Sequence, residues 1–488
     1  MFLCADHPVS GRNVSRVNVD VAVVGRELSG LVAAALCAHA GRRVMVIDDG
    51  EQHARLLGDR LAPNVPSLWR LPSSGPVASV LDDLGFKADA RRILGDGFGV
   101  GVVDDPDLRC VFPVGDDARV RELGRALGDH GRSLAARLQA FDFSHRHPAL
   151  TELRALHEDG WFFQARRARK RVRQLGSFGA IDADDADVCA LWGDGSGLAP
   201  VLTQLAAFVQ WRSRAPAQGL SAALALSMLQ GGTVLGGAGA GLGPRPAFIE
   251  MLLGFIAHHG GEVVRDRVVS LEAQGRVVTA IRTELRRDEI VAVAVIDATA
   301  ARDLVDRLPV GRPREKLLAQ QGKVVVVGGA TSVRWLVPVR VLPRGMPPVL
   351  LALDPAGAAP TLVGIYGGAA SSESGKGSHL DEHLVCVVAT AGIHDSGPIE
   401  ATLNRLMPFA RPAVRAADVV DVSSVAAHFE LKDSEHILGG RRPRTPLKNL
   451  VRAGRDLAPA WGTDGEIVAA RSVFALVDKL FPKQPPST

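Results

Sequence analysis

Three segments near the start of the chain alternate between strand-like and helix-like hydrophobic patterns. Residues 19–24, VDVAVV, form a continuous β-branched run, which is typical of a parallel strand buried on both faces. Small apolar residues follow at helical spacing over 31–39 and end before Gly41, which predicts a helix with a glycine cap. A second buried strand is predicted over 44–48. Together these segments predict one β–α–β unit.

The rest of the chain indicates an inserted domain, followed by a return of the β–α–β pattern. Between about residues 51 and 230, turns rich in Pro and Gly separate long helical stretches, which indicates an inserted domain. After a glycine-dense loop over 229–246, the pattern predicts a helix, one strand over 261–271 and a hairpin, so the first domain returns. Residues 311–438 are predicted as strands and turns with a helical part near 381–408. A strand, a loop and a helix are predicted to close the chain.

Composition limits the classes of function. The chain is 47% hydrophobic and 23% charged, which is a globular composition. Its 488 residues are enough for two or three domains. The net charge of +4 is too small to predict nucleic acid as a partner. Five scattered cysteines without a C-x-x-C pair argue against disulfides or zinc and favour a reducing cytoplasm. No apolar run is long enough for a signal peptide or a membrane span.

One strongly basic segment bears on the expected location and partners of the protein. Residues 165–173, ARRARKRVR, carry six cations in nine residues. We expect either a solvated helix face or a contact with anionic lipid or a protein partner near Arg169. The expected location is therefore cytoplasmic, with peripheral membrane contact as the alternative.

The turn after the first strand is a variant of a dinucleotide-binding loop. Such loops have the pattern G-x-G-x-x-G, whose glycines let backbone amides and a helix N-terminus approach the pyrophosphate. Here Gly25 and Gly30 hold the first and third glycine positions and Ser29 precedes the third, but Glu27 replaces the second glycine. Glu27 could occupy the anion site itself, or it could turn outward while Arg26 binds the pyrophosphate. The residues leave both possibilities open.

An acid stands where the ribose would be recognised. Asp48 ends the second strand, eighteen residues after Gly30, where an acid normally accepts hydrogen bonds from ribose hydroxyls. The alternative is that Asp48 belongs to an ordinary turn after a strand.

With the later glycine-rich segments, the sequence resembles the FAD-dependent oxidoreductases of the phytoene desaturase and amine-oxidase-like type, whose fold the GDP dissociation inhibitors share. The resemblance implies that the backbone of Val268 packs on adenine and that Val295–Ala300, which includes Ala298, returns to the cofactor. It also implies that a C-terminal strand, an Ala-Gly turn and a helix close the flavin site. The matching residues are Ala453, Gly454, Asp456, Pro459, Gly462, Gly465 and Glu466.

The resemblance implies an α/β fold: a Rossmann-type FAD/NAD(P)-binding domain, discontinuous in sequence, with an inserted α+β substrate or cap domain. The predicted segments are 18–75, 230–310 and 440–488 for the FAD-binding domain, 76–229 and 311–439 for the cap domain, and 1–17 for an N-terminal tail. Two departures weaken the pyrophosphate side. The second glycine is lost, and residues 57–60, LGDR, lack the paired glycines of the family motif.

No motif for hydrolysis, metal binding or nucleoside triphosphates is present, and the His258–His259 pair is expected to cap a helix. Flavin chemistry needs no protein nucleophile, so the catalytic residues stay unassigned. The resemblance implies non-covalent FAD and hydride transfer from a hydrophobic small molecule to flavin. The resemblance also implies that an amine oxidase would build a pair of aromatic side chains before the flavin. Because Tyr366 is the only tyrosine, this pair would need Trp or Phe, and an amine substrate is disfavoured.

The alternative is a non-catalytic binding protein on the same scaffold, like the GDP dissociation inhibitors. Glu27 favours it, whereas Asp48 and the close-approach glycines count against it. A dehydrogenase that uses only NAD has no need of the C-terminal glycine loop. The substrate, the electron acceptor and the oligomeric state do not follow from the sequence.

Overall fold

The computed structural model describes most of the two ends of the chain and scattered parts of its middle. The described residues are 15–48, 76–86, 100–104, 108–113, 115–140, 244–299, 304–321, 324–326, 330–338, 346–347, 349–352, 361–367, 383–391, 397–408, 415–421, 429–431, 442–457 and 462–482.

The first sheet joins strands from distant parts of the sequence. Its order is β5-β2-β1-β8-β7-β6, and β16 also pairs with β8. The strands are β1 (Arg16–Val24), β2 (Val44–Asp48), β5 (Glu262–Arg265), β6 (Val268–Gln274), β7 (Val277–Thr283), β8 (Glu289–Asp297) and β16 (Leu450–Arg452). β1 runs parallel to β2 and β8, and β8 runs parallel to β16, whereas β7 is antiparallel to both of its neighbours. The parallel part is that of a Rossmann-type domain.

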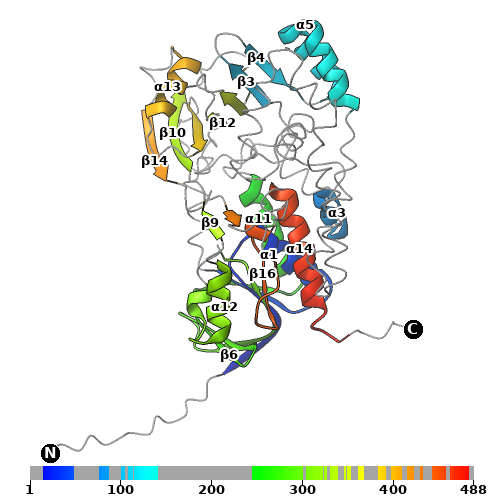
Figure 1. The fold of residues 1–488 in the computed structure, drawn as a ribbon, viewed down its shortest axis with the longest axis vertical. Coiled ribbons are helices and arrows are strands. Elements are labelled where there is room, and N and C mark those ends of the chain that lie inside the picture. The colour runs from blue at the N-terminus through cyan, green and yellow to red at the C-terminus, as the bar shows by residue number, and fades with distance from the viewer. Residues whose placement is uncertain are drawn as a thin grey trace, which may run out of the picture.

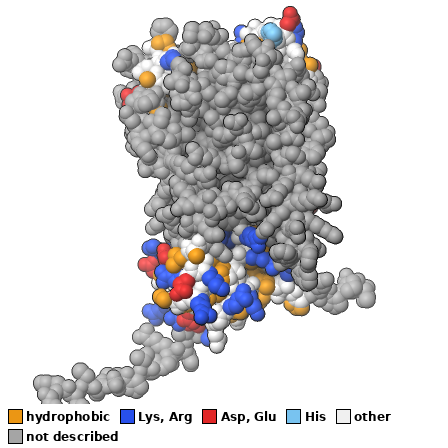
Figure 2. All heavy atoms as spheres, viewed as in Figure 1, with side chains coloured by type: hydrophobic (Ala, Val, Ile, Leu, Met, Phe, Trp, Pro, Cys, Tyr) orange, Lys and Arg blue, Asp and Glu red, His pale blue; other side chains and the backbone are white. Residues whose placement is uncertain are grey.

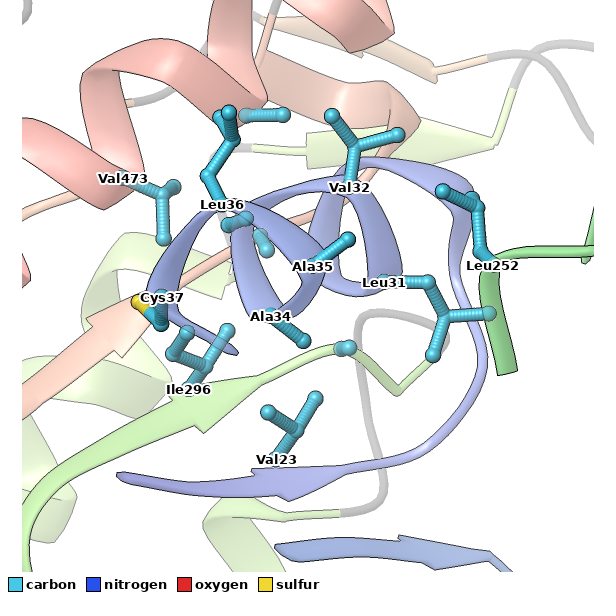
Figure 3. Packing of buried hydrophobic residues seen from close by; sticks show 14 of the residues in the cluster. Val23, Leu31, Val32, Ala34, Ala35, Leu36, Cys37, Leu252, Ile296 and Val473 are labelled. Carbon is cyan, nitrogen blue, oxygen red and sulfur yellow. The ribbon is translucent and has the colours of Figure 1, made fainter. Parts of the chain in front are cut away.

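One face of this sheet is covered by helices, of which α1 (Leu28–His39) is the central one. Residues 28–38 of α1 are all buried, because the sheet lies on one side and two other helices lie on the other. Figure 3 shows Val23 and Ile296 of the sheet below α1, with Leu252 of α11 (Pro244–His258) and Val473 of α14 (Gly462–Asp478) around it. The short side chains of α1 allow this close packing.

The opposite face has its own hydrophobic core. Met45, Ile47 and Val295 pack there against the 3-10 helix η2 (Val305–Arg307) and against Leu317 of α12 (Arg312–Gln321). The domain therefore has three layers, with the parallel strands buried on both faces. Around this domain, at the lower end of Figure 2, Lys and Arg side chains lie among Asp and Glu.

A second sheet lies toward the other end of the molecule (Figure 1). Its order is β14-β10-β13-β12-β11-β3-β4. The strands are β3 (Val100–Asp104), β4 (Leu108–Phe112), β10 (Ala330–Pro338), β11 (Val349–Ala352), β12 (Thr361–Gly367), β13 (His383–Ala391) and β14 (Arg415–Asp421). The other elements are α3 (Pro76–Asp83), α5 (Asp116–Ala140), α13 (Gly397–Leu406) and the paired strands β9 (Val324–Val326) and β15 (Phe429–Leu431). The predicted α/β class is confirmed.

Two predictions of local structure are wrong. Residues 261–271, expected as one strand, form β5 and β6 on opposite edges of the sheet. The chain turns between them at Asp266, whose buried carboxylate accepts hydrogen bonds from the amides of Arg267, Leu285 and Arg286. Residues 383–391, inside a stretch expected to be helical, form β13, because β-branched residues in this run pair with β10 and β12.

The helix expected over 247–260 is confirmed as α11, which ends at His258. His259 Nδ1 lies 3.1 Å from the carbonyl oxygen of Phe255, which is the expected capping contact. Within the described residues, no helix combines the length and the apolar character needed to span a bilayer.

Candidate functional site

Four strands of the first sheet end at one edge, and the predicted site residues follow them. Val24 of β1 lies opposite Ile47 of β2 and Asp297 of β8 in the parallel register, and Arg452 of β16 also lies opposite Asp297. The carboxyl ends of parallel strands are where ligands bind in open α/β sheets. The edge therefore brings together the glycine turn, Asp48 and the C-terminal Ala-Gly turn.

The two glycines of the turn are required by packing against Ala298. Gly25 has φ +93°, and a Cβ there would lie 2.4 Å from the carbonyl oxygen of Ala298. A Cβ on Gly30 would lie 2.2 Å from the Ala298 Cβ. The Glu27 amide donates a hydrogen bond of 3.0 Å to the same carbonyl oxygen. Packing within the protein therefore accounts for both glycines without any contact to a ligand.

Glu27 is buried directly before α1. Its side chain is 5% exposed, and it is the N-cap residue of the helix without a side-chain capping hydrogen bond. The outward orientation considered from the sequence is therefore wrong. A carboxylate at this position is stabilised by the helix dipole by about 0.3–1 kcal/mol, so Glu27 places negative charge where a dinucleotide would bring its pyrophosphate.

Arg26 contacts the acid that was predicted to bind ribose. Its Nε lies 2.7 Å from Asp48 Oδ2, and its Nη1 lies 3.5 Å from Glu250 Oε1. The Nε contact is a charge pair and not an aligned hydrogen bond. Both side chains are largely buried, at 13% and 5% exposed. In the structure, Arg26 therefore neutralises Asp48 instead of reaching a site for pyrophosphate.

The structure adds two buried charges that sequence reasoning missed. Asp297 ends β8 and Arg452 ends β16, and both are buried. Burial raises the pKa of Asp297, although the charge of Arg452 and hydrogen bonds from the Thr299 hydroxyl (2.7 Å) and amide oppose the shift. The signal was an acid at the end of one strand and a cation at the end of another, and only strand pairing shows that they meet.

The C-terminal turn joins the same edge. The Ala453 amide donates to the carbonyl oxygen of Asp297 at 2.7 Å. Asp456, in the 3-10 helix η5 (Arg455–Leu457), is buried, and a Cβ on Gly454 would lie 2.6 Å from its Oδ1. Gly465 lies in the first turn of α14 and is followed by the buried Glu466. The predicted Ala-Gly turn is therefore adjacent to the end of β8.

Val268 also lies near this edge. The amide of Asp266, two residues earlier, donates to the carbonyl oxygen of Asp48 at 3.1 Å. Val268 itself is 3% exposed and begins β6. Its predicted contact with adenine stays a prediction, as do the cofactor roles of the other site residues.

Ser29 carries a buried polar atom without a partner among the described residues. It lies in the first turn of α1 and is fully buried, and no described residue forms a hydrogen bond with its Oγ. A buried hydroxyl without a partner costs about 1–3 kcal/mol. Such an atom at a helix N-terminus is suited to an anionic ligand.

Several predicted features lie outside the described residues. These are residues 57–60, the basic segment near Arg169 and Pro459. Among the residues that the structure does describe, no group of three or more His, Cys, Asp or Glu could hold a metal ion.

The sequence matches no protein-family model and no curated protein. Solved structures do resemble it. An oxidoreductase from Methanosarcina mazei is 14% identical, with 93% of this chain and 99% of that chain covered and a TM-score of 0.52. The PF1083 protein from Pyrococcus furiosus is 14% identical over 95% and 98%, with a TM-score of 0.51. A Rab GDI from Plasmodium falciparum is 11% identical over 93% and 98%, with a TM-score of 0.47.

These likenesses concern the fold. The first sheet and its helices form a Rossmann-type domain, as predicted, and the chain is similar in fold to the oxidoreductase from Methanosarcina mazei. At these identities the likeness carries no residue roles, so the chemistry must be argued from the site.

Proposed function

We propose that this chain is an FAD-dependent oxidoreductase that oxidises a hydrophobic small molecule. The observation that carries the proposal is the buried Ser29 hydroxyl, which lies in the first turn of α1 and has no hydrogen-bond partner among the residues that the structure describes. A phosphate oxygen would accept its hydrogen bond in an environment where helix amides also point at the ligand.

The two halves of the site fit FAD unequally. On the flavin side, the Ala453-Gly454 turn follows β16, and α14 packs against α1. On the adenosine side, Arg26 pairs with Asp48 and Glu27 is buried before α1. FAD would therefore be held mainly by Ser29, Gly454 and the first turn of α14.

The residues that hold FAD would position it to supply the redox chemistry, which is hydride acceptance from the substrate. The protein's own contribution would be to orient the cofactor and to set the electrostatics around it. Asp297 and Arg452, both buried at the ends of neighbouring strands, would contribute to these electrostatics. The hydrophobic substrate rests on the sequence resemblance and on the predicted cap domain.

The first experiment is the visible absorption spectrum of the purified protein, before and after incubation with FAD and removal of the excess. A retained flavin band supports the proposal, and a colourless protein that takes up no FAD refutes it. Ser29→Ala is expected to weaken FAD binding about tenfold, the effect of losing one hydrogen bond to a charged group. Ser270→Ala, on β6, is the matched control and should leave binding unchanged.

Substrate oxidation needs its own measurement. Anaerobic addition of a hydrophobic substrate should bleach the flavin band, because the oxidised ring accepts the hydride. Bleaching by polar substrates only would refute the substrate class while leaving the cofactor proposal intact.

A second candidate is a cofactor-free binding protein on this scaffold. The pairing of Arg26 with Asp48 favours it, because the site's ribose acid is already neutralised by the chain. The argument that close-approach glycines speak against such a protein loses its force at Gly25 and Gly30, since packing against Ala298 requires both. Failure of FAD uptake in the experiment above is the outcome this candidate expects.

A further inference from the structure

We infer that Arg26 sets the nucleotide specificity of the site by competing with the adenosine ribose for Asp48. The inference rests on the proposed function, because it concerns how the site takes up FAD. It reverses the role that the sequence allowed for Arg26, which was to attract the pyrophosphate.

The competition follows from the distance between Arg26 and Asp48. The guanidinium Nε lies 2.7 Å from Asp48 Oδ2, which is the distance a ribose hydroxyl would need to donate to that oxygen. Asp48 is the last residue of β2 and is 5% exposed at its side chain, so little of the carboxylate is open to a second partner. A ribose that binds Asp48 must therefore displace the guanidinium.

Arg26 is held in this position from two sides. Its Nη1 lies 3.5 Å from Oε1 of Glu250 on α11, and Gly25 and Glu27, on either side of it in the chain, are fixed by backbone hydrogen bonds to Ile47 and Ala298. The side chain is only 13% exposed. A pair in this environment is screened weakly by salt, so displacement costs binding free energy.

The contact is also one that can be broken. The Nε–H of Arg26 is not aligned with the Asp48 oxygen, so the pair lacks the added strength of a directed hydrogen bond.

The competition for Asp48 should affect FAD and not FMN, because FMN has no adenosine ribose. Arg26 should therefore weaken FAD binding and leave FMN binding unaffected.

The test compares the dissociation constants of FAD and FMN, measured by quenching of flavin fluorescence on titration with the full-length protein. Arg26→Met removes the charge and keeps an unbranched chain. It should tighten FAD binding about tenfold, which is about 1.4 kcal/mol, and leave FMN binding unchanged. Arg42→Met is the matched control, because Arg42 pairs with Asp478 away from the site at 3.3 Å. It should change neither constant.

A second variant guards against a folding defect in Arg26→Met. Glu250→Gln removes the outer partner, which is half-exposed, and should tighten FAD binding in the same direction by about two- to threefold. If FAD binding is unchanged or weaker in both variants, the inference is wrong, and weaker binding would mean that Arg26 holds the pyrophosphate. If neither FAD nor FMN binds to the wild type or to the variants, the proposed function fails as well.

Discussion

The sharpest structural prediction concerns the contact between Gly30 and Ala298. Gly30→Ala would place a methyl group 2.2 Å from the Ala298 Cβ. Carbon atoms in contact prefer about 3.5 Å, so α1 and β8 would have to separate by more than 1 Å. α1 cannot move away freely, because α11 and α14 pack against it (Figure 3).

The cost of this substitution can be estimated from over-packing in other protein cores. Over-packing costs about 1–3 kcal/mol, and we expect about 3 kcal/mol here because helices confine α1 on the side away from the sheet. Ala298→Gly should cost about 1 kcal/mol by itself, for a lost buried methyl group and a more flexible unfolded chain. If the two changes acted independently, the double variant would lose about 4 kcal/mol.

The structure predicts a different result for the double variant. With Gly at position 298, the nearest remaining contacts of a Cβ at position 30 are the position 298 Cα at 3.4 Å and the Ala453 Cβ at 3.6 Å, which are ordinary distances. The double variant should therefore lose only about 1 kcal/mol, a coupling of about 3 kcal/mol.

The assay is urea denaturation followed by far-UV circular dichroism. Gly254→Ala is the matched control, because Gly254 lies in α11 and, among the described residues beyond the neighbouring backbone of that helix, no atom lies within 4 Å of an added Cβ. It should stabilise the protein by up to about 1 kcal/mol through helix propensity. Additive losses in the Gly30→Ala/Ala298→Gly double variant would refute the packing argument and return Gly30 to the role of a cofactor-approach glycine.

Three further variants test other parts of the domain by the same denaturation assay. Asn449→Leu should cost about 2–3 kcal/mol, because the Asn449 side chain accepts from the Val278 amide at 2.8 Å and donates to its carbonyl at 2.9 Å; a loss below 1 kcal/mol would contradict this. For Asp266, burial raises the pKa, but the nearby Thr283 hydroxyl and hydrogen bonds from the amides of Leu285, Arg267 and Arg286 outweigh it and lower the pKa overall. Its stabilisation is therefore present above the ordinary aspartate range near about pH 4 and lost in acid, so the deficit of Asp266→Asn should shrink as the pH falls. Asp297 is the opposite case: because its pKa is raised, its contribution is largest in acid and is lost as the pH rises, so Asp297→Asn should gain on the wild type above about pH 4. A pH-independent difference for either aspartate variant would contradict the direction of its shift.

Much of the first domain could be predicted from the sequence because its signals are local. A continuous β-branched run predicts a strand buried on both faces, and small apolar residues at helical spacing predict the helix that packs on it. β2 falls on the predicted residues 44–48, and the predicted helix over 31–39 is contained in α1. Gly25, Gly30 and Asp48 could be found because the turn after a first strand and the end of a second strand are fixed positions in this unit.

The errors arose where partners distant in sequence decide the structure. Residues 383–391 form a strand because β10 and β12 lie on either side of them, and β5 separates from β6 because the Asp266 carboxylate binds amides from both 267 and 285–286. Neither set of partners is visible in a local pattern.

For this protein the sequence by itself determined the β–α–β unit and the candidate residues that lie at the carboxyl ends of its parallel strands. Only the tertiary structure decided what those residues do to one another. In the structure, Arg26 contacts Asp48 and Glu250, and Glu27 is buried before α1. Asp297 lies opposite Arg452 in two paired strands. The physical reason is that hydrophobic periodicity is encoded residue by residue, whereas the partner of a buried charge is set by which chain segments the fold brings within a few ångströms of it.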